Sequence, residues 1–299
     1  MRIAISGASG LIGSALASDL TATGHSVVRL VRRAAQSSDE ISWLPPEAAD
    51  GPDRQALRGI DAVVHLAGAP IASGRWTQAR KAVLRASRIQ TTAALVAAMI
   101  AVADGPRALL CGSAVGWYGD TGEEIVDESA PSGSGFLAEL VRDWEAAAAP
   151  AAQAGIRVVN LRTGVVLASG GGMLGRLTLP FRLGLGARLG SGSQYLSWIS
   201  LEDEVRAIRF LLDNPGVSGP VNLTAPDPVT NAAFTAALAK AVGRPAFLRV
   251  PSSLLNVGLG EVASELLAGA RVVPRKLLDA GFSFTDPDIA AALASALAT

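Results

Sequence analysis

The sequence has only one cysteine, two histidines and two tyrosines among its 299 residues, and each scarcity excludes a kind of chemistry. Cys111 cannot form a disulfide within the chain. One thiol together with His25 and His65 is too few for a thiolate zinc cluster, and the carboxylates show no spacing that would complete a zinc site. We therefore expect no metal site.

An excess of charge is also missing, because 26 lysines and arginines balance 26 acidic residues. Nucleic-acid and anionic-membrane surfaces need a basic excess or a basic stripe, and no basic cluster extends beyond single pairs. The longest apolar helical run, 93–103, is far shorter than the roughly 18–20 residues a bilayer requires. Met1 and Arg2 lead directly into an apolar strand, without room for a signal peptide. We expect a soluble, cytoplasmic protein with no nucleic-acid or membrane partner.

Apolar residues, by contrast, are abundant: 49% of the chain is hydrophobic and 17% is charged, which allows a large buried core. Continuously apolar strands that alternate with helices are typical of a doubly wound parallel sheet covered on both faces. We predict an α/β fold, a Rossmann-type doubly wound parallel sheet with a smaller, α-rich C-terminal substrate lobe. The strands are predicted at 2–6, 26–31, 62–66, 108–112 and 158–161, and the helices between them at 11–23, 79–103 and 136–154.

The sequence changes character after residue 163, where glycines interrupt a stretch with no long periodic segment. Helices are predicted at 201–213 and 231–242, and two or three more in the Pro- and Ala-rich C-terminal region. Glu202, Asp203 and Glu204 are interpreted as the acidic first turn of the former helix, where negative charge complements the helix dipole. We assign residues 1–167 and 193–224 to the nucleotide-binding domain, and 168–192 and 225–299 to the smaller lobe.

Three glycines, Gly7, Gly10 and Gly13, follow the first predicted strand and open the first predicted helix. In this position the first permits the tight turn, the second lets the backbone approach a diphosphate, and the third lets the helix pack closely. The helix N-terminus presents free N–H groups and the positive end of its dipole to phosphates. We predict dinucleotide binding; the alternative is a tight turn without a ligand.

The end of the second predicted strand distinguishes the two nicotinamide cofactors. An acidic residue there would bind the ribose hydroxyls of NAD, whereas arginine suits the 2′-phosphate of NADP. The sequence has Arg32 and Arg33 and no acidic residue before Asp39, and guanidinium groups bind phosphate well. We predict NADP(H) as the cofactor; alternatively, the two arginines only solubilise a loop.

Several longer segments are similar to one known family. They read HLAGAPI at 65–71, GSAVGWYG at 112–119, FLAEL at 136–140, LRTGVVL at 161–167, LPFRLGLG at 179–186 and SWI at 197–199. Together they resemble the atypical, epimerase-family group of the extended short-chain dehydrogenase/reductases, once named as homologues of the cell-division inhibitor SulA. The run from Gly260 to Phe282 is similar to the small C-terminal domain of that group.

The resemblance implies a Rossmann fold with NADP(H) lying across the ends of the parallel strands. In the family the turn 66–68 passes beneath the adenosine ribose, Arg88 could reach the cofactor, and the segment 165–166 lies near the nicotinamide. One departure is Ala69, where many members have glutamate. The residues implied in cofactor binding, besides the three glycines and Arg32 and Arg33, are Leu11, Ile12, Leu66, Ala67, Gly68, Arg88, Val165 and Val166.

The catalytic pattern of the superfamily is missing. A typical member has Tyr-x-x-x-Lys on a helix, where the lysine and the nicotinamide cation lower the tyrosine pKa from ~10 toward the working range. The tyrosine position falls on Phe136 and the lysine position on Leu140. Neither side chain transfers a proton, so acid/base chemistry would need another group.

Four residues are candidates for chemistry or substrate contact. Ser113 matches the hydroxyl of the superfamily's catalytic group, and Tyr118 follows a strand end, where open α/β sheets bind ligands. Gln194 and Trp198 follow a glycine-rich loop that resembles the substrate-facing edge of extended members. The alternatives are that Tyr118 packs at the cofactor's edge with its hydroxyl satisfied, and that Trp198 is a core residue beside a turn.

These features favour an NADP(H)-dependent oxidoreductase that acts on a small, partly apolar substrate with a non-standard proton donor. The alternative from another class is a non-catalytic NADP(H)-binding protein, in which the nucleotide stabilises the fold or reports redox state to a partner. Nucleotide-sugar epimerisation is a weaker hypothesis, because it relies on the tyrosine base. We expect a monomer or a homodimer.

Overall fold

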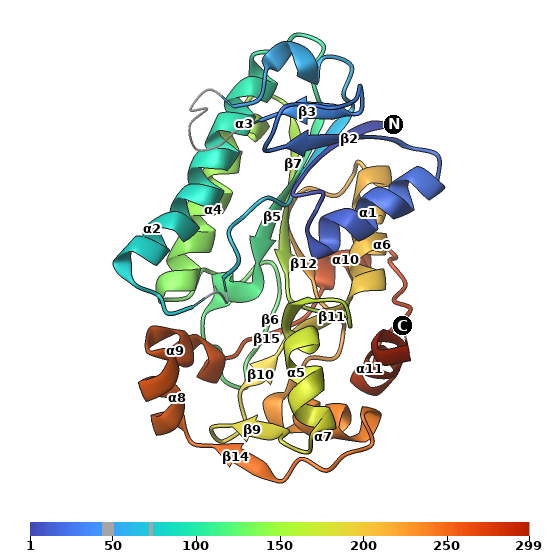
Figure 1. Cartoon of the computed structure of the whole chain (residues 1–299). Helices are drawn as coiled ribbons and strands as arrows, with labels where there is room; N and C mark the ends of the chain where they lie inside the picture. The colour runs from blue at the N-terminus through green and yellow to red at the C-terminus, as the bar shows by residue number, and fades with distance from the viewer. Residues whose placement is uncertain (44–50, 72–73, 299) are drawn as a thin grey trace.

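A computed structural model describes residues 1–43, 51–71 and 74–298 (Figure 1). At its centre is a seven-stranded sheet, parallel throughout, with the strand order β12-β7-β5-β4-β1-β2-β3. The chain winds from β1 toward β3 on one side and toward β12 on the other, and ligands of open α/β sheets bind at the carboxyl ends of strands beside such a switch point. The strands are β1 (Arg2–Ser6), β2 (Ser26–Val31), β3 (Glu40–Ser42), β4 (Ala62–His65), β5 (Ala108–Ala114), β7 (Arg157–Thr163) and β12 (Gly219–Leu223).

Helices cover both faces of this sheet (Figure 1). On one face lie α1 (Leu11–Ala22) and α6 (Leu201–Asp213), and on the other lie α3 (Thr91–Ile100) and α4 (Phe136–Gln153). Successive strand residues alternate between the two apolar layers: Ile3 and Ile5 face α1 and α6, whereas Ala4 faces the other side. Both faces are buried, which explains why the strands read as continuous apolar runs.

A smaller lobe lies beyond the carboxyl ends of the strands and has an apolar cluster of its own (Figure 1). Its short strands pair as β8 with β11, β9 with β14 and β10 with β13. The strands are β8 (Val165–Leu167), β9 (Ala187–Leu189), β10 (Tyr195–Leu196), β11 (Trp198–Ser200), β13 (Val229–Thr230) and β14 (Leu248–Val250). The helices are α5 (Gly172–Arg182), α7 (Asn231–Ala241), α8 (Ser252–Leu259), α9 (Glu261–Leu267) and α11 (Ile289–Ala298).

One C-terminal segment returns to the large sheet. Strand β15 (Arg271–Val272) pairs with β6 (Ile125–Val126), and α10 (Arg275–Asp279) packs against β12. Leu277 and Phe282 belong to the same apolar cluster as Ile3, on the face covered by α1 and α6. This part of the region 225–299 therefore packs on the seven-stranded sheet and not in the smaller lobe.

The structure confirms the predicted fold class, and most predicted elements lie within a few residues of their expected bounds. The predicted helix 79–103 is α2 (Gln78–Arg85) joined to α3 through a single π-helical turn, Ala86–Gln90. Helix α5 was not predicted, because it opens on two glycines and contains Pro180, both unfavourable in an isolated helix. Within the described ranges, no helix combines the length and the apolar character needed to cross a membrane.

Candidate functional site

The phosphate loop has the backbone geometry that its three glycines predict. Gly7 has a φ of +73°, and a Cβ there would lie 2.9 Å from the backbone of Leu66 and Ala67. A Cβ on Gly13 would collide with the carbonyl oxygen of Gly7. Gly10 is the N-cap of α1, and no side chain caps that helix end. The first N–H groups of α1 are thus left for an anionic ligand at the carboxyl edge of the sheet.

Arg88 lies beside the turn that follows β4. A Cβ on Gly68 would come within 3.2 Å of the Arg88 guanidinium, which also lies 5.2 Å from the ring of Trp144. Its Nη1 donates to the Ala69 carbonyl at 3.1 Å. The π-helical turn of Ala86–Gln90 holds Arg88 at its centre, and such turns are frequent at functional sites.

Arg88 is a buried cation without an acidic partner among the described residues. Arg88 is only 9% exposed, and within the described ranges its guanidinium forms no ion pair. Burial, and then the nearby charge of Arg80, lower the pKa of Arg88 to about 10, so it stays protonated at neutral pH. Because an unpaired buried charge is unfavourable, this position suits an anionic group of a ligand.

Arg33 already has an acidic partner, Glu40 at the start of β3. The guanidinium donates to both carboxylate oxygens, from Nη1 to Oε2 at 2.7 Å and from Nη2 to Oε1 at 2.5 Å. The hydrogen bond from Arg33, and then that from the Gln36 backbone, lower the pKa of Glu40 to about 2. Arg32 is exposed. Of the two arginines predicted to bind the 2′-phosphate, Arg32 is accessible and Arg33 is paired with Glu40. A 2′-phosphate would therefore have to share the Arg33 guanidinium with the Glu40 carboxylate or displace that carboxylate.

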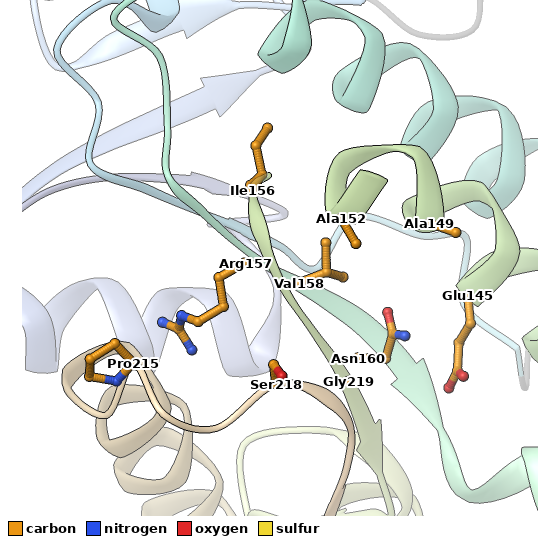
Figure 2. A pocket seen from close by; sticks show the side chains of 10 residues that line it. All are labelled: Glu145, Ala149, Ala152, Ile156, Arg157, Val158, Asn160, Pro215, Ser218 and Gly219. Carbon is orange, nitrogen blue, oxygen red and sulfur yellow. The ribbon is translucent and has the colours of Figure 1, made fainter. Parts of the chain in front are cut away.

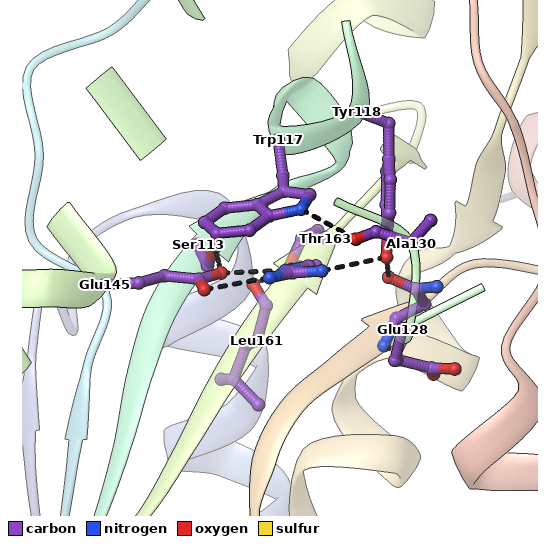
Figure 3. A network of polar contacts seen from close by, with 10 residues as sticks. Ser113, Trp117, Tyr118, Glu128, Ala130, Glu145, Leu161 and Thr163 are labelled. Atoms are coloured by element: carbon purple, nitrogen blue, oxygen red, sulfur yellow. Dashed lines mark hydrogen bonds and ion pairs between the residues drawn. The ribbon is translucent and has the colours of Figure 1, made fainter. Parts of the chain in front are cut away.

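Ser113 and Tyr118 belong to one buried polar network (Figure 3). Ser113 Oγ donates to Glu145 Oε1 at 2.6 Å, and Arg162 donates to the same carboxylate through Nε at 2.8 Å and Nη2 at 3.0 Å. Arg162 Nη1 also donates to Tyr118 Oη at 3.1 Å. Tyr118 Oη in turn donates to Asn222 Oδ1 at 2.7 Å. The network joins α4 to the ends of β5, β7 and β12.

The network leaves Tyr118 little capacity for catalysis. Tyr118 is 3% exposed, and burial raises the pKa of its hydroxyl more than the neighbouring Arg162 lowers it. Its single hydrogen is donated to Asn222. Ser113 is likewise buried and donates to Glu145. This geometry favours the alternative that Tyr118 is a structural residue with a satisfied hydroxyl.

An apolar cluster occupies the positions of the usual tyrosine and lysine. Phe136 and Leu140, on the first two turns of α4, are buried together with Trp76 and Leu84. The rings of Trp76 and Phe136 meet edge to face at 5.1 Å. The Lys81 ammonium lies 4.8 Å from the centre of the Phe136 ring. At these two positions of α4, neither side chain can donate or accept a proton.

The predicted nicotinamide segment connects the two lobes. Val165 and Val166 are half-buried on β8, which runs parallel to β11. Helix α5 then begins against the phosphate loop, since a Cβ on Gly171 or Gly172 would lie 3.5 Å from the Leu11 side chain. A Cβ on Gly172 would also lie 3.5 Å from the Val166 carbonyl oxygen, so the start of α5 lies between a residue predicted to bind the diphosphate and one predicted to border the nicotinamide.

The structure does not place Trp198 as a substrate contact. Trp198 is fully buried on β11, in the apolar cluster of the small lobe, and its Nε1 donates to the Asp227 carbonyl at 3.0 Å. It is a core residue without accessible surface, buried together with Leu167 and Phe234. Gln194 is half-buried and donates to the Leu189 carbonyl at 3.2 Å.

A cavity of about 580 Å³ lies elsewhere, between α4 and the sheet edge formed by β7 and β12 (Figure 2). Arg157 and Gly219, which line it, are the first residues of their strands, so the cavity opens on the amino-terminal half of the edge. It is not part of the phosphate-loop site. Among the described residues, no group of three or more potential metal ligands converges.

Comparison with known proteins agrees with this geometry. Residues 3–223 match the NAD dependent epimerase/dehydratase family, and residues 250–296 match a domain of unknown function, DUF1731. The chain belongs to the NAD-dependent epimerase/dehydratase family. This confirms the resemblance found in the sequence motifs.

Relatives in this family cover the whole chain. An epimerase family protein of Mycobacterium bovis is 53% identical over 293 residues, which are 97% of this chain and 96% of that protein. The crystal structure of human epimerase family protein SDR39U1 with NADPH has a TM-score of 0.91 and 35% identity, with 100% of both chains covered. A nucleoside-diphosphate sugar epimerase from Corynebacterium glutamicum has a TM-score of 0.81 and 35% identity, covering 99% of this chain and 58% of that one.

The ion pairs of the site were not predicted from the sequence. Glu145, Arg162 and Glu40 each complete an ion pair there, but the partners are 17 and seven residues apart and lie on different elements. Their only signal in the sequence was that Glu145 and Arg162 stand inside or beside the family motifs. Tertiary pairing of this kind has no local pattern.

Proposed function

We propose that this chain is an NADP(H)-binding oxidoreductase that acts on a small, partly apolar substrate and uses a proton donor other than the usual tyrosine. The observation that carries this proposal is the juxtaposition of two features at one sheet edge. The phosphate loop is intact, whereas Phe136 and Leu140 fill the positions of the tyrosine and lysine. The human relative solved with NADPH supports the choice of cofactor.

The residues at the sheet edge fit a bound dinucleotide. The uncapped start of α1 would hold the diphosphate, and Gly7 and Gly13 leave the room that a Cβ would fill. Arg32 and Arg33 would bind the 2′-phosphate, and Arg88 would supply an anion partner beside Gly68. Val165 and Val166 would border the nicotinamide. When bound, the reduced cofactor supplies a hydride.

The chemistry most compatible with this site is reduction of an activated double bond. A conjugated carbonyl or an iminium group accepts a hydride with little help from an enzymic acid, so such a reaction tolerates Phe136. The cluster of Phe136, Leu140 and Trp76 would exclude water from the reacting atoms, as a dry site requires. An apolar wall also favours a partly apolar substrate over a phosphorylated sugar.

The test is a screen for oxidation of NADPH, followed by its absorbance, with conjugated enones, aldehydes and cyclic imines. The proposal predicts turnover with at least one of these classes, and loss of turnover in Gly13→Ala, which blocks the phosphate loop. Gly216→Ala is the matched control, since a Cβ there meets no atom within 4 Å. Binding of NADPH without oxidation by any class would contradict the enzyme proposal.

A non-catalytic NADP(H)-binding protein is the second candidate, and one observation favours it. The hydroxyls of Ser113 and Tyr118 are both committed within the buried network, so neither faces a ligand. In this case NADPH would raise the melting temperature by mass action without being consumed. Sugar epimerisation is less compatible with the site, because Phe136 cannot deprotonate a sugar hydroxyl.

A further inference from the structure

Glu204 is a completely buried carboxyl in the first turn of α6, beside the carboxyl end of β7. Its Oε1 lies 2.9 Å from Oγ1 of Thr163, the last residue of β7. Its Oε2 is buried and has no hydrogen-bond partner among the described residues. The carboxyl is therefore not acting as a cap of its own helix, a role that the Ser200 hydroxyl takes by accepting from the Asp203 backbone.

Among the described residues, no cation forms an ion pair with this carboxyl. Helix α6 packs against α1, β5, β8 and β11, and the three strands contain no charged residue. On α6 itself, Glu202 and Asp213 are exposed. The remaining charged groups on these elements and on β7 near Glu204 are already paired, as Asp19 with Arg209, Asp203 with Arg206, and Glu145 with Arg162.

The hydrogen-bond contacts of Thr163 favour the protonated form of the Glu204 carboxyl over the ionised form. Thr163 Oγ1 lies between two acceptors, 2.9 Å from Glu204 Oε1 and 3.3 Å from the Leu161 carbonyl oxygen. A threonine hydroxyl has one hydrogen and can donate to only one of them. Both contacts are hydrogen bonds when Glu204 is protonated, because the carboxyl then donates to Thr163 while Thr163 donates to Leu161. Burial raises the pKa of Glu204 to about 8, in agreement with this count.

Thr163 lies at the edge of the sheet where the ligand is proposed to bind. It ends β7 at the carboxyl edge of the sheet, between Ala114 at the end of β5 and Leu223 at the end of β12. Only Gly164 separates it from Val165 and Val166, the residues proposed to border the nicotinamide. Unlike Glu204, Thr163 is only half-buried, and its contact with Glu204 is partly open to solvent.

We propose that Glu204 is the proton donor of the reduction and that Thr163 relays its proton to the substrate. This inference rests on the proposed oxidoreductase function and names the donor which that function lacks. One hydride from the reduced nicotinamide brings an electron pair to one atom of a C=C, C=N or C=O bond. The hydroxyl proton of Thr163 passes to the other atom, and the proton of Glu204 replaces it on Thr163. Glu204 is left as a carboxylate and regains a proton from water through the Thr163 hydroxyl after product release.

The first test needs neither cofactor nor substrate. Because the folded-state pKa of Glu204 lies above its unfolded value, protonation stabilises the folded state, and that stability is lost as pH rises from about 4.5 to about 8. The urea midpoint of the wild type should fall relative to that of Glu204→Gln across this interval. Glu202→Gln, which alters an exposed carboxyl on the same turn, should follow the wild type. If Glu204→Gln also follows the wild type, Glu204 is ionised and the proposal is overturned.

The second test asks whether the protonation of Glu204 responds to the bound cofactor. Infrared spectra of the wild type should show the carbonyl stretch of a protonated carboxyl, which Glu204→Gln should lack. Saturating NADP⁺ should diminish this band, since the positive nicotinamide favours a nearby carboxylate, whereas NADPH should preserve it. A band that NADP⁺ leaves unchanged would overturn the relay while leaving cofactor binding intact. If neither nucleotide binds, the proposed function fails and the relay with it, although the pH-dependent stability difference would remain.

A pair of substitutions then separates the relay from a purely structural role. Thr163→Val removes the hydroxyl at nearly constant volume, and Thr163→Ser keeps it. For any NADPH oxidation found in the screen, the valine variant should lose at least about tenfold in kcat with little change in KM, and the serine variant should recover most of it. Equal rates in the two variants would contradict a relay through Thr163.

Discussion

At the scale of single residues, we expect the ion pair of Arg33 with Glu40 to control how readily the 2′-phosphate of the proposed cofactor is bound. The phosphate must compete with a carboxylate that both Arg33 and the Gln36 backbone hold in its charged form. Glu40→Gln should therefore lower the Kd for NADPH by a few-fold, because an exposed ion pair is weak and its loss frees the guanidinium. The Kd for NADH, which has no 2′-phosphate, should not change.

Fluorescence titration of the bound nucleotide measures both constants, with Glu202→Gln as a control far from the second strand. Weaker NADPH binding in Glu40→Gln would mean that Glu40 orients Arg33 for the phosphate instead of competing with it. A change of the Kd for NADPH in either direction would show that Glu40 influences cofactor binding.

Arg88 is the second residue whose substitution should change the affinity for NADPH. A buried guanidinium without an acidic partner destabilises the free protein and gains a partner when an anionic ligand binds. Arg88→Gln should leave the melting temperature of the free protein no lower than that of the wild type, yet raise the Kd for NADPH by about tenfold or more, the loss of one charge-assisted hydrogen bond. Arg85→Gln is the matched control one turn away, since Arg85 already pairs with Glu139 and Asp143. Unchanged NADPH affinity in Arg88→Gln would show that Arg88 has only a packing role.

At the scale of elements, the close approach of α1 to the end of β1 depends on Gly13. A methyl group there would collide with the Gly7 carbonyl and move the helix start away from the sheet. Gly13→Ala should lower the free energy of unfolding by about 1–3 kcal/mol, as expected for overpacking, and abolish the NADPH-induced rise in melting temperature. Differential scanning fluorimetry measures both effects, and Gly216→Ala should show neither. A normal NADPH shift in Gly13→Ala would place the diphosphate elsewhere.

The same elements show what the sequence could and could not predict. Strands β1 and β2 and helix α6 have the predicted bounds, because apolar runs between glycines and an amphipathic helix with a serine cap are local patterns. Helix α5 was missed because packing, and not propensity, stabilises a segment with Gly171, Gly172 and Pro180. The backbone geometry of the glycine turn after β1 could be predicted because it is local. The network of Ser113, Glu145, Arg162 and Tyr118 could not be predicted, because the segment 112–119, α4 and β7 meet only after folding.

At the scale of the whole molecule, two buried groups make stability depend on pH in opposite directions. Burial lowers the pKa of His65 to about 4, so stability is lost as pH falls from its unfolded value of 6.5 toward that pKa. Glu204 does the reverse and gains stability as pH falls from about 8 to about 4.5. Each effect is on the order of 3 kcal/mol or somewhat more at full extent.

The two contributions should nearly cancel in the wild type between about pH 6.5 and about pH 4.5. Urea unfolding across this range should show a shallow dependence for the wild type, a clear loss on acidification for Glu204→Gln, and a gain on acidification for His65→Asn. Parallel curves for all three proteins would mean that neither group changes its protonation on folding.

We propose that the N-terminal half of the chain binds NADP(H) through the phosphate loop and the two arginines after β2. The most direct measurement is calorimetric titration of NADPH and of NADH into the wild type and into the double variant Arg32→Ala, Arg33→Ala. We predict that the wild type binds NADPH at least about tenfold more tightly than NADH, and that the double variant loses this preference. Absence of binding by either nucleotide to the wild type would contradict the dinucleotide site and every catalytic proposal built on it.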